Sequence, residues 1–275
     1  MTVETHVDRA RDRVAAERDA TADERRAYER FRSTVASVPT VTAGGGGSAG
    51  DGLGTGTGSG PVGGGVRAVA GGANASSTDG CRRVREAFAE TVRPHSVPGG
   101  SGGEPLLATV RAELGETVAV ALSPKTGHGF TRPVASAVES AVDDRLAELA
   151  VFDRTLEREA ASLRSAGEAV REVTDWLSTA DETPLSAFGF DDLRRRHEAL
   201  GERIEACEAL LAARQSDLDR TASRGAAVGL RQRSTAAYLY DDFPVSHPVL
   251  STVTRLVETL RECGRAVRDH LVRRA

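Results

Sequence analysis

Two cysteines and two histidines occupy apolar positions of two helices predicted in the C-terminal half of the chain. Cys207 and His197 belong to the first helix, and Cys263 and His270 belong to the second. If the two helices pack antiparallel with Cys207 level with Cys263, His197 lies near His270. However, Cys263 and His270 are seven residues apart, which is roughly 10 Å along a helix and too far for one tetrahedral zinc ion. Cysteine is often buried, so we interpret the four as core residues.

Four arginines recur at every seventh residue near the N-terminus, which places them on one side of a helix. They are Arg11, Arg18, Arg25 and Arg32. Such a row could bind the phosphates of a nucleic acid. Acids of the same segment are available to pair with them, namely Asp8, Asp12, Glu17 and Glu24. We therefore prefer a solvated helix flank with local ion pairs.

Eight acids lie on the outer side of the longest predicted helix. They are Glu139, Asp143, Asp144, Glu148, Glu157, Glu159, Glu168 and Glu172. A metal site would need acids that converge from different helices, and no Glu-x-x-His pattern accompanies them. Glu157 and Glu159 are two residues apart and do not share a helix face. We interpret this side as solvated.

A serine and a histidine stand side by side at Ser246-His247, five residues after Asp241. These are the residue types of a catalytic triad. Their surroundings lack the glycine-flanked turn and the oxyanion hole that such a nucleophile needs. A turn and a helix N-cap explain these residues naturally, so we prefer that interpretation and assign no catalytic residue.

Two glycine-containing segments could bind phosphate. Residues Gly45 to Gly50 satisfy the pattern G-x-G-x-x-G, but no predicted strand precedes them and no predicted helix begins there. Lys125 and His128 lie in a turn rich in Pro and Gly, where a tight turn is a sufficient explanation. We assign no cofactor-binding residue and no metal ligand.

The elements that would position these residues are helices. Val142, Leu149, Leu156, Leu163, Val170 and Leu177 recur at every seventh residue and predict a helix over 133–178, roughly 70 Å long. Apolar residues at alternating spacings of four and three predict two more long helices, at 191–221 and 248–273. Shorter helices are predicted at 80–93, 105–122 and 236–240. Tyr238 and Tyr240 would lie at the edge of the bundle.

The predicted domain organisation has three parts. Residues 1–38 form a charged N-terminal helix with a thin apolar row, residues 39–78 form a flexible glycine-rich linker, and residues 79–275 form a helical bundle. More than half of the 29 glycines fall between Gly44 and Gly80. We therefore expect an all-α, elongated antiparallel bundle with coiled-coil-like packing and a disordered linker after the first helix.

The composition supports this fold class and narrows the function. Aromatic residues make up 4% of the chain and charged residues 28%, which suits amphipathic helices better than sheets. The net charge of -4 does not favour nucleic acid or acidic lipid as a partner. The first residues lack a signal peptide, and no uncharged run is apolar enough to span a bilayer. We expect a cytoplasmic protein with no membrane segment.

Six stretches of the chain resemble an uncharacterised haloarchaeal family that is known only as a domain of unknown function. They read CRRVREAFAETV (81–92), PLLATVRAEL (105–114), LEREAASLR (156–164), FDDLRRRHEAL (190–200), YLYDDFPVSHPVLSTVTRL (238–256) and CGRAVRDHLVRR (263–274). The resemblance implies a helical, cytoplasmic, archaeal protein. It implies no activity, cofactor or catalytic residue.

Three functions are consistent with these observations. The first is a non-enzymatic scaffold or interaction protein whose partner is a second copy or another helical protein. The second is a regulatory or nucleic-acid-associated protein that uses arginine-rich helix faces. The third is a hydrolase or metal-dependent enzyme, which no motif of the sequence favours.

Overall fold

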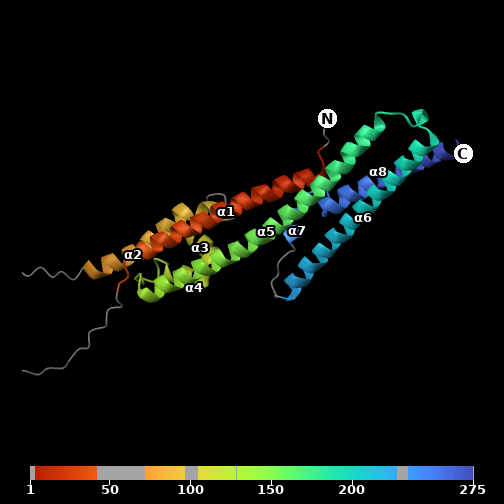
Figure 1. Cartoon of the computed structure of the whole chain (residues 1–275). Helices are drawn as coiled ribbons and strands as arrows, with labels where there is room; N and C mark the ends of the chain where they lie inside the picture. Colours follow the sequence, from red (N-terminus) through yellow and green to blue (C-terminus); the bar gives the residue numbers. More distant parts are fainter. Residues whose placement is uncertain (1–3, 42–71, 97–104, 128, 228–234, 275) are drawn as a thin grey trace, which may run out of the picture. The chain divides into compact units, whose positions relative to one another are not determined.

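The computed structural model describes residues 4–41, 72–96, 105–127, 129–227 and 235–274. Within these ranges the structure is helical, and the single β-bridge joins Val41 to Thr131. Its α-helices are α1 (His6–Ser37), α2 (Gly72–Thr91), α3 (Leu106–Leu114), α4 (Glu116–Ala121), α5 (Arg132–Asp181), α6 (Phe190–Ala227), α7 (Thr235–Leu239) and α8 (Pro248–Val272) (Figure 1). The prediction of an all-α fold is confirmed.

Two differences from the predicted helices are the largest. Helix α2 begins at Gly72, eight residues before the predicted start at residue 80, so the end of the predicted linker 39–78 is helical. Residues 42–71 of that linker lie outside the described ranges. The predicted helix 105–122 is divided into α3 and α4 at Gly115, whose φ of 88° is left-handed. Glycine adopts this conformation without steric cost, and it ends α3.

The described structure forms two compact units. The first contains residues 1–19 and 152–275, and the second contains residues 20–151. Helices α1 and α5 therefore contribute to both. This grouping differs from the predicted division into a separate helix (1–38) and one bundle (79–275). The apolar row of α1 is buried in both units, with Val7 and Val14 in the first and Tyr28, Phe31 and Val35 in the second.

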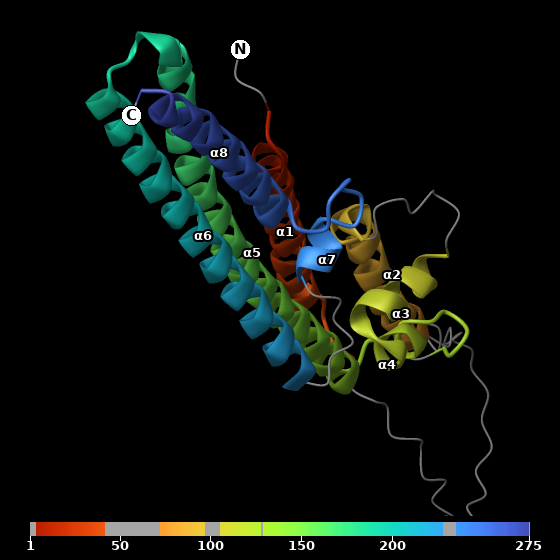
Figure 2. The same cartoon turned by 90° about the vertical axis from the view of Figure 1, so that its right-hand side faces the viewer.

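The first unit packs α1, α5, α6 and α8 around one apolar core. Its buried residues include the following: Val7 and Val14 from α1, Leu156 and Leu163 from α5, Leu193 and Leu200 from α6, and Val253 and Leu260 from α8. Helices α6 and α8 lie side by side (Figure 2). They are antiparallel, because Arg261 contacts Glu208 at 2.6 Å while Arg268 contacts His197 at 3.5 Å.

The second unit has its own core, in which aromatic side chains are central. Its buried residues include the following: Tyr28, Phe31 and Val35 from α1, Val84 and Phe88 from α2, Val110 from α3, Val118 from α4, and Val138 and Val142 from α5. The rings of Phe31 and Phe88 meet edge to face with their centroids 5.5 Å apart. This geometry is favourable for aromatic pairs and anchors α2 on α1.

A glycine in α2 allows the close approach of the loop before α5. A Cβ atom added at Gly80 would lie 2.7 Å from Cβ of Phe130, which is itself fully buried. We expect Gly80→Ala to lower the free energy of unfolding by about 1–3 kcal/mol, because the buried ring must move.

The matched control is Gly201→Ala in α6, where a Cβ would meet nothing within 4 Å. It should raise stability by about 0.5–1 kcal/mol through helix propensity. Thermal unfolding followed by circular dichroism measures both, and equal midpoints for the two variants would contradict the packing at Gly80.

Candidate functional site

The heptad row of arginines on α1 is used in ion pairs. Within the helix, Arg11 lies 4.0 Å from Asp8 and Arg25 lies 3.6 Å from Glu29. Asp8 also accepts hydrogen bonds from the backbone and hydroxyl of Thr5. Partial burial raises the pKa of Asp8, but these hydrogen bonds and nearby arginines outweigh it, so the pKa lies below its ordinary value.

The other two arginines of the row reach acids of α5. In the first unit, Arg18 lies 3.4 Å from Glu157 and 3.9 Å from Asp153. In the second unit, Arg32 lies 3.3 Å from Asp143. The row is therefore in ion pairs, as expected. Of the expected partners, Asp8 pairs with a member of the row, while Glu17 lies 3.9 Å from Arg13 and Glu24 lies 2.9 Å from Arg145. Half of the row crosses to another helix, and the acids of α5 are in part the reason that α1 packs there.

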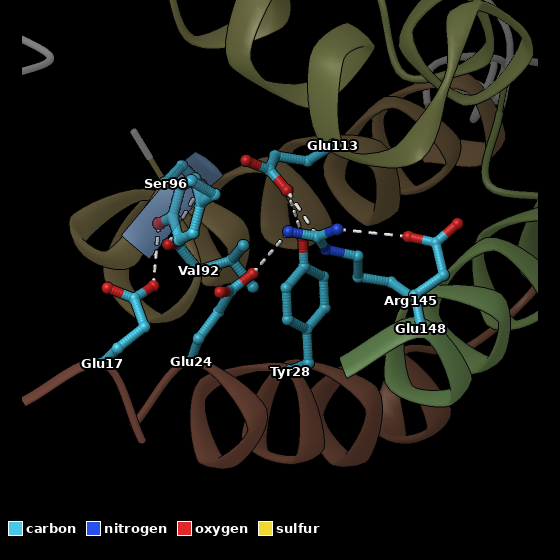
Figure 3. A network of polar contacts seen from close by, with 9 residues as sticks. Glu17, Glu24, Tyr28, Val92, Ser96, Glu113, Arg145 and Glu148 are labelled. Atoms are coloured by element: carbon cyan, nitrogen blue, oxygen red, sulfur yellow. Dashed lines mark hydrogen bonds and ion pairs between the residues drawn. The ribbon is translucent and has the colours of Figure 1, made fainter. Parts of the chain in front are cut away.

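A partly buried polar network lies in the second unit, where α1, α3 and α5 meet. Arg145 donates to Glu24 at 2.9 Å and to Glu148 at 3.1 Å, and its Nε lies 3.7 Å from Glu113 (Figure 3). The hydroxyl of Tyr28 donates to Glu113 at 2.7 Å. Burial opposes the charge on Arg145, but the three carboxylates outweigh it and raise its pKa. Burial raises the pKa of Glu24, and the charge of Arg145 opposes this rise.

A second network that joins an arginine, a glutamate and a tyrosine lies in the first unit. Arg214 on α6, whose side chain is 6% exposed, donates to both carboxylate oxygens of Glu159 on α5 at 2.6 and 2.9 Å. It also donates to Ser162 at 3.0 Å. The hydroxyl of Tyr240 donates to Glu159 at 2.6 Å. Tyr240 is therefore buried in the core, and the prediction that it lies at the bundle edge is wrong.

Both networks combine an arginine, a glutamate and a tyrosine from separate elements of one unit. Strongly shifted pKa values mark catalytic sites, but structural ion pairs shift them as well. Here each carboxylate accepts hydrogen bonds or lies in an ion pair. Burial is the main cause that raises the pKa of Tyr28 and of Tyr240, and the neighbouring glutamate raises it further. A neutral tyrosine that donates to a paired glutamate is a poor base and a poor nucleophile. The networks are suited to fixing helix register.

The raised pKa values predict the alkaline behaviour of the protein. A free tyrosine ionises near pH 10, and the folded state holds the protons of Tyr28 and Tyr240 more tightly than the unfolded chain does. Stability should therefore be full below about pH 10 and fall as the pH rises further. Absorbance at 295 nm, taken as the difference from Tyr28→Phe and Tyr240→Phe, should show each phenol ionising only as the helices unfold. Ionisation of either one near pH 10 in the folded protein would contradict its network.

The cysteine and histidine pairs lie in the contact between α6 and α8. Cys207 is buried, Cys263 is half-buried, and all three cysteines are free thiols. Burial raises the pKa of the Cys207 thiol, which remains protonated and unreactive at neutral pH. The side chain that lies 3.5 Å from Nε2 of His197 is that of Arg268 rather than that of His270. No group of His, Cys, Asp and Glu able to hold a metal ion occurs within the described ranges.

The remaining candidate residues are not brought together into a site. His247 precedes α8 as its N-cap residue without a capping side-chain hydrogen bond, and Ser246 and Asp241 are exposed. The glycine pattern at 45–50 and His128 lie outside the described residues. Lys125 is exposed in the turn after α4, where its backbone N–H donates to Ser123.

The sequence contains a signal for the buried networks that the predictions overlooked. Arg145 and Glu159 fall on a second seventh-residue row of α5, together with Val138, Phe152, Ala166 and Val173. Arg214 likewise occupies the α6 seam position between Leu211 and Leu218. A charged residue at a seam position is a candidate for a buried pair that fixes register. Glu159 was interpreted as solvated, and that interpretation is wrong.

These observations define the class of the protein. It is an all-α protein whose long helices are joined by apolar seams and inter-helix ion pairs, and none of its described helices is sufficiently long and apolar to traverse a bilayer. A family model described as a domain of unknown function (DUF7260) matches residues 5–264. The chain belongs to this family, as the resemblance of its helical segments predicts. No curated protein and no solved structure matches it.

Proposed function

We propose that this protein is a non-enzymatic helical scaffold that acts by binding other proteins. The observation that carries the proposal is that the arginine row of α1 is already in ion pairs. A protein that binds phosphate through this row would leave the arginines free to contact the phosphates. All four members of the row lie beside carboxylates of α1 or α5. The charge that would attract a polyanion is neutralised locally, and long exposed helix faces are what the chain offers to a partner.

The polar networks support the same proposal. They join helices with hydrogen bonds that need defined partners at defined positions, so they favour one arrangement of the helices over others. A scaffold benefits from such fixed geometry, because a rigid helix face binds with a smaller loss of entropy. The proposal places the protein in the archaeal cytoplasm, where free thiols such as Cys81 and Cys207 persist.

A nucleic-acid-associated role is the second candidate, and it rests on helix α8. Arg255 on α8 and Arg273, the residue after its end, are exposed, and neither is in an ion pair within the described part of the chain. Acids of the same helix, Glu258 and Glu262, are exposed beside them. Such mixed charge favours a protein partner over a phosphate backbone.

Fractionation of a native cell extract tests the proposal. The chain has a mass of 28.9 kDa, so gel filtration followed by immunodetection should find it in a clearly larger assembly. Treatment of the extract with nuclease should leave that elution unchanged. Elution at the monomer position would contradict the scaffold role, and a shift to that position after nuclease treatment would favour the second candidate.

A further inference from the structure

Six exposed residues form a straight line along the part of α5 that belongs to the first unit. We call this line the α5 stripe, and its members are Arg154, Arg158, Ala161, Ser165, Glu168 and Glu172. Their spacings are four, three, four, three and four residues, which is the alternation of a coiled-coil seam. The stripe lies on the side of α5 away from the buried row that contains Leu156 and Leu163.

The order of residue types along the α5 stripe is self-complementary. Two arginines come first, two small residues follow, and two glutamates come last. Arg154 and Glu172 are equally far from position 163, as are Arg158 and Glu168, and as are Ala161 and Ser165. If an identical helix is laid against the stripe in the opposite direction, each arginine meets a glutamate.

Among the residues that the structure describes, the charges of the α5 stripe have no such partner. Neighbouring acids of α5 are in ion pairs, Glu157 with Arg18 and Glu159 with Arg214. Over the described residues, no ion pair involves any of the four charged members of the stripe. Arg154 and Arg158 are four residues apart, as are Glu168 and Glu172. Like charges at this spacing repel each other on a helix surface. Opposite charges supplied by another molecule would reduce the repulsion within the arginine pair and within the glutamate pair.

We propose that a second copy of this chain binds the α5 stripe, so that two α5 helices pack antiparallel about a two-fold axis near position 163. Arg154 pairs with Glu172 of the partner and Arg158 pairs with Glu168 of the partner, which gives four ion pairs in the dimer. Ala161 and Ser165 meet at the centre, where their small side chains let the helices approach closely. The inference deepens the proposed scaffold function and rests on it.

The length of the contact sets its strength. Eighteen residue steps along a helix span about 27 Å, and a single helix pair of this length forms a small interface. Small interfaces give weak, reversible association. Exposed ion pairs are screened by salt. The dimer is therefore concentration-dependent, and its dissociation constant rises with ionic strength.

Charge reversal of the purified full-length chain tests the pairing. In sedimentation velocity at low salt, the wild type should associate as its concentration rises. R154E/R158E and E168R/E172R each replace four attractions by repulsions, so each should raise the dissociation constant at least tenfold. An equimolar mixture of these two variants should form a heterodimer. The quadruple variant R154E/R158E/E168R/E172R has the wild-type net charge and a reversed but still self-complementary stripe, so it should associate as the wild type does.

Cysteine cross-linking tests the register. In an antiparallel pair centred on position 163, residue 161 of one copy lies opposite residue 165 of the other. Chains with Ala161→Cys mixed with chains with Ser165→Cys should form a disulfide-linked dimer under mild oxidation, and neither variant alone should do so as efficiently. Like-with-like cross-linking would indicate a parallel arrangement and overturn the proposal.

A monomeric wild type up to high concentration, or double variants that associate as the wild type does, would also overturn it. The gel-filtration result for the native extract distinguishes failure of the dimer proposal from failure of the scaffold proposal. A large assembly in the extract together with a purified chain that stays monomeric refutes self-association through the α5 stripe, while the scaffold function stands. Circular dichroism spectra identical to that of the wild type establish that the variants are folded.

Discussion

Arg214→Ala is expected to lower the free energy of unfolding of the first unit by about 3–5 kcal/mol, the usual cost of breaking one side of a buried ion pair. The guanidinium makes two hydrogen bonds to Glu159 and a third to Ser162. After its removal Glu159 remains largely buried, and among the described residues Tyr240 is left as its hydrogen-bond donor. The loss is thus mainly that of a carboxylate left without a counter-charge.

Chemical denaturation of Arg214→Ala, Glu159→Ala and the double variant measures this coupling. The double variant should be less destabilised than the sum of the two single variants, because the second substitution removes the charge that the first leaves unpaired. Arg220→Ala is the matched control, since this arginine of the same helix is exposed and pairs locally with Asp217. It should change stability by no more than about 0.5 kcal/mol. Additive single-variant effects would contradict a buried pair.

Phe88→Ala is expected to destabilise the second unit by about 3–5 kcal/mol, through lost burial and the cavity left behind. The ring is fully buried and contacts Phe31 edge to face, while Val84 and Val92 of the same helical face are also buried. Helix α2 holds to its unit mainly through this face. The change should therefore loosen α2 in particular.

Hydrogen exchange resolved by peptide distinguishes this local effect from general unfolding. Amides of α2 should lose protection in Phe88→Ala, whereas Phe88→Leu, which keeps an apolar side chain of similar reach, should retain most of it. A cycle with Phe31→Ala should reveal a coupling of about 0.5–1.5 kcal/mol for the aromatic pair. Unchanged exchange in α2 would show that Phe88 is not the anchor that its burial implies.

The sequence was sufficient to predict the helices and most of the core. The seventh-residue row was expected to face the core, and its members Leu156 and Leu163 are buried. The buried face of such a helix carries an apolar residue about every seventh position. This spacing is local to the helix, so it can be read directly from the sequence. The apolar row of the N-terminal helix was predicted, but not that Val7 and Val14 on this row are fully buried.

The polar networks depend on contacts between distant segments and were not predicted. Glu159 differs from its neighbour Glu157 only in facing α6 rather than α1, and the pairing of helices decides which one is buried. Tyr240 lies just after a helix of five residues. A helix this short has no apolar repeat from which the burial of Tyr240 could be predicted. Gly115 interrupts a continuous apolar pattern, because its left-handed φ overrides that pattern.

Affinity purification of the tagged full-length chain from its native cells, with nuclease present, tests the central claim that this protein works by binding proteins. We expect one or a few proteins to co-purify in amounts comparable to the chain, together with untagged copies of the chain itself. Proteins that bind the α5 stripe should be lost with R154E/R158E, while partners of other faces should remain. Recovery of the chain alone, or only of nucleic acid when nuclease is omitted, would contradict the account.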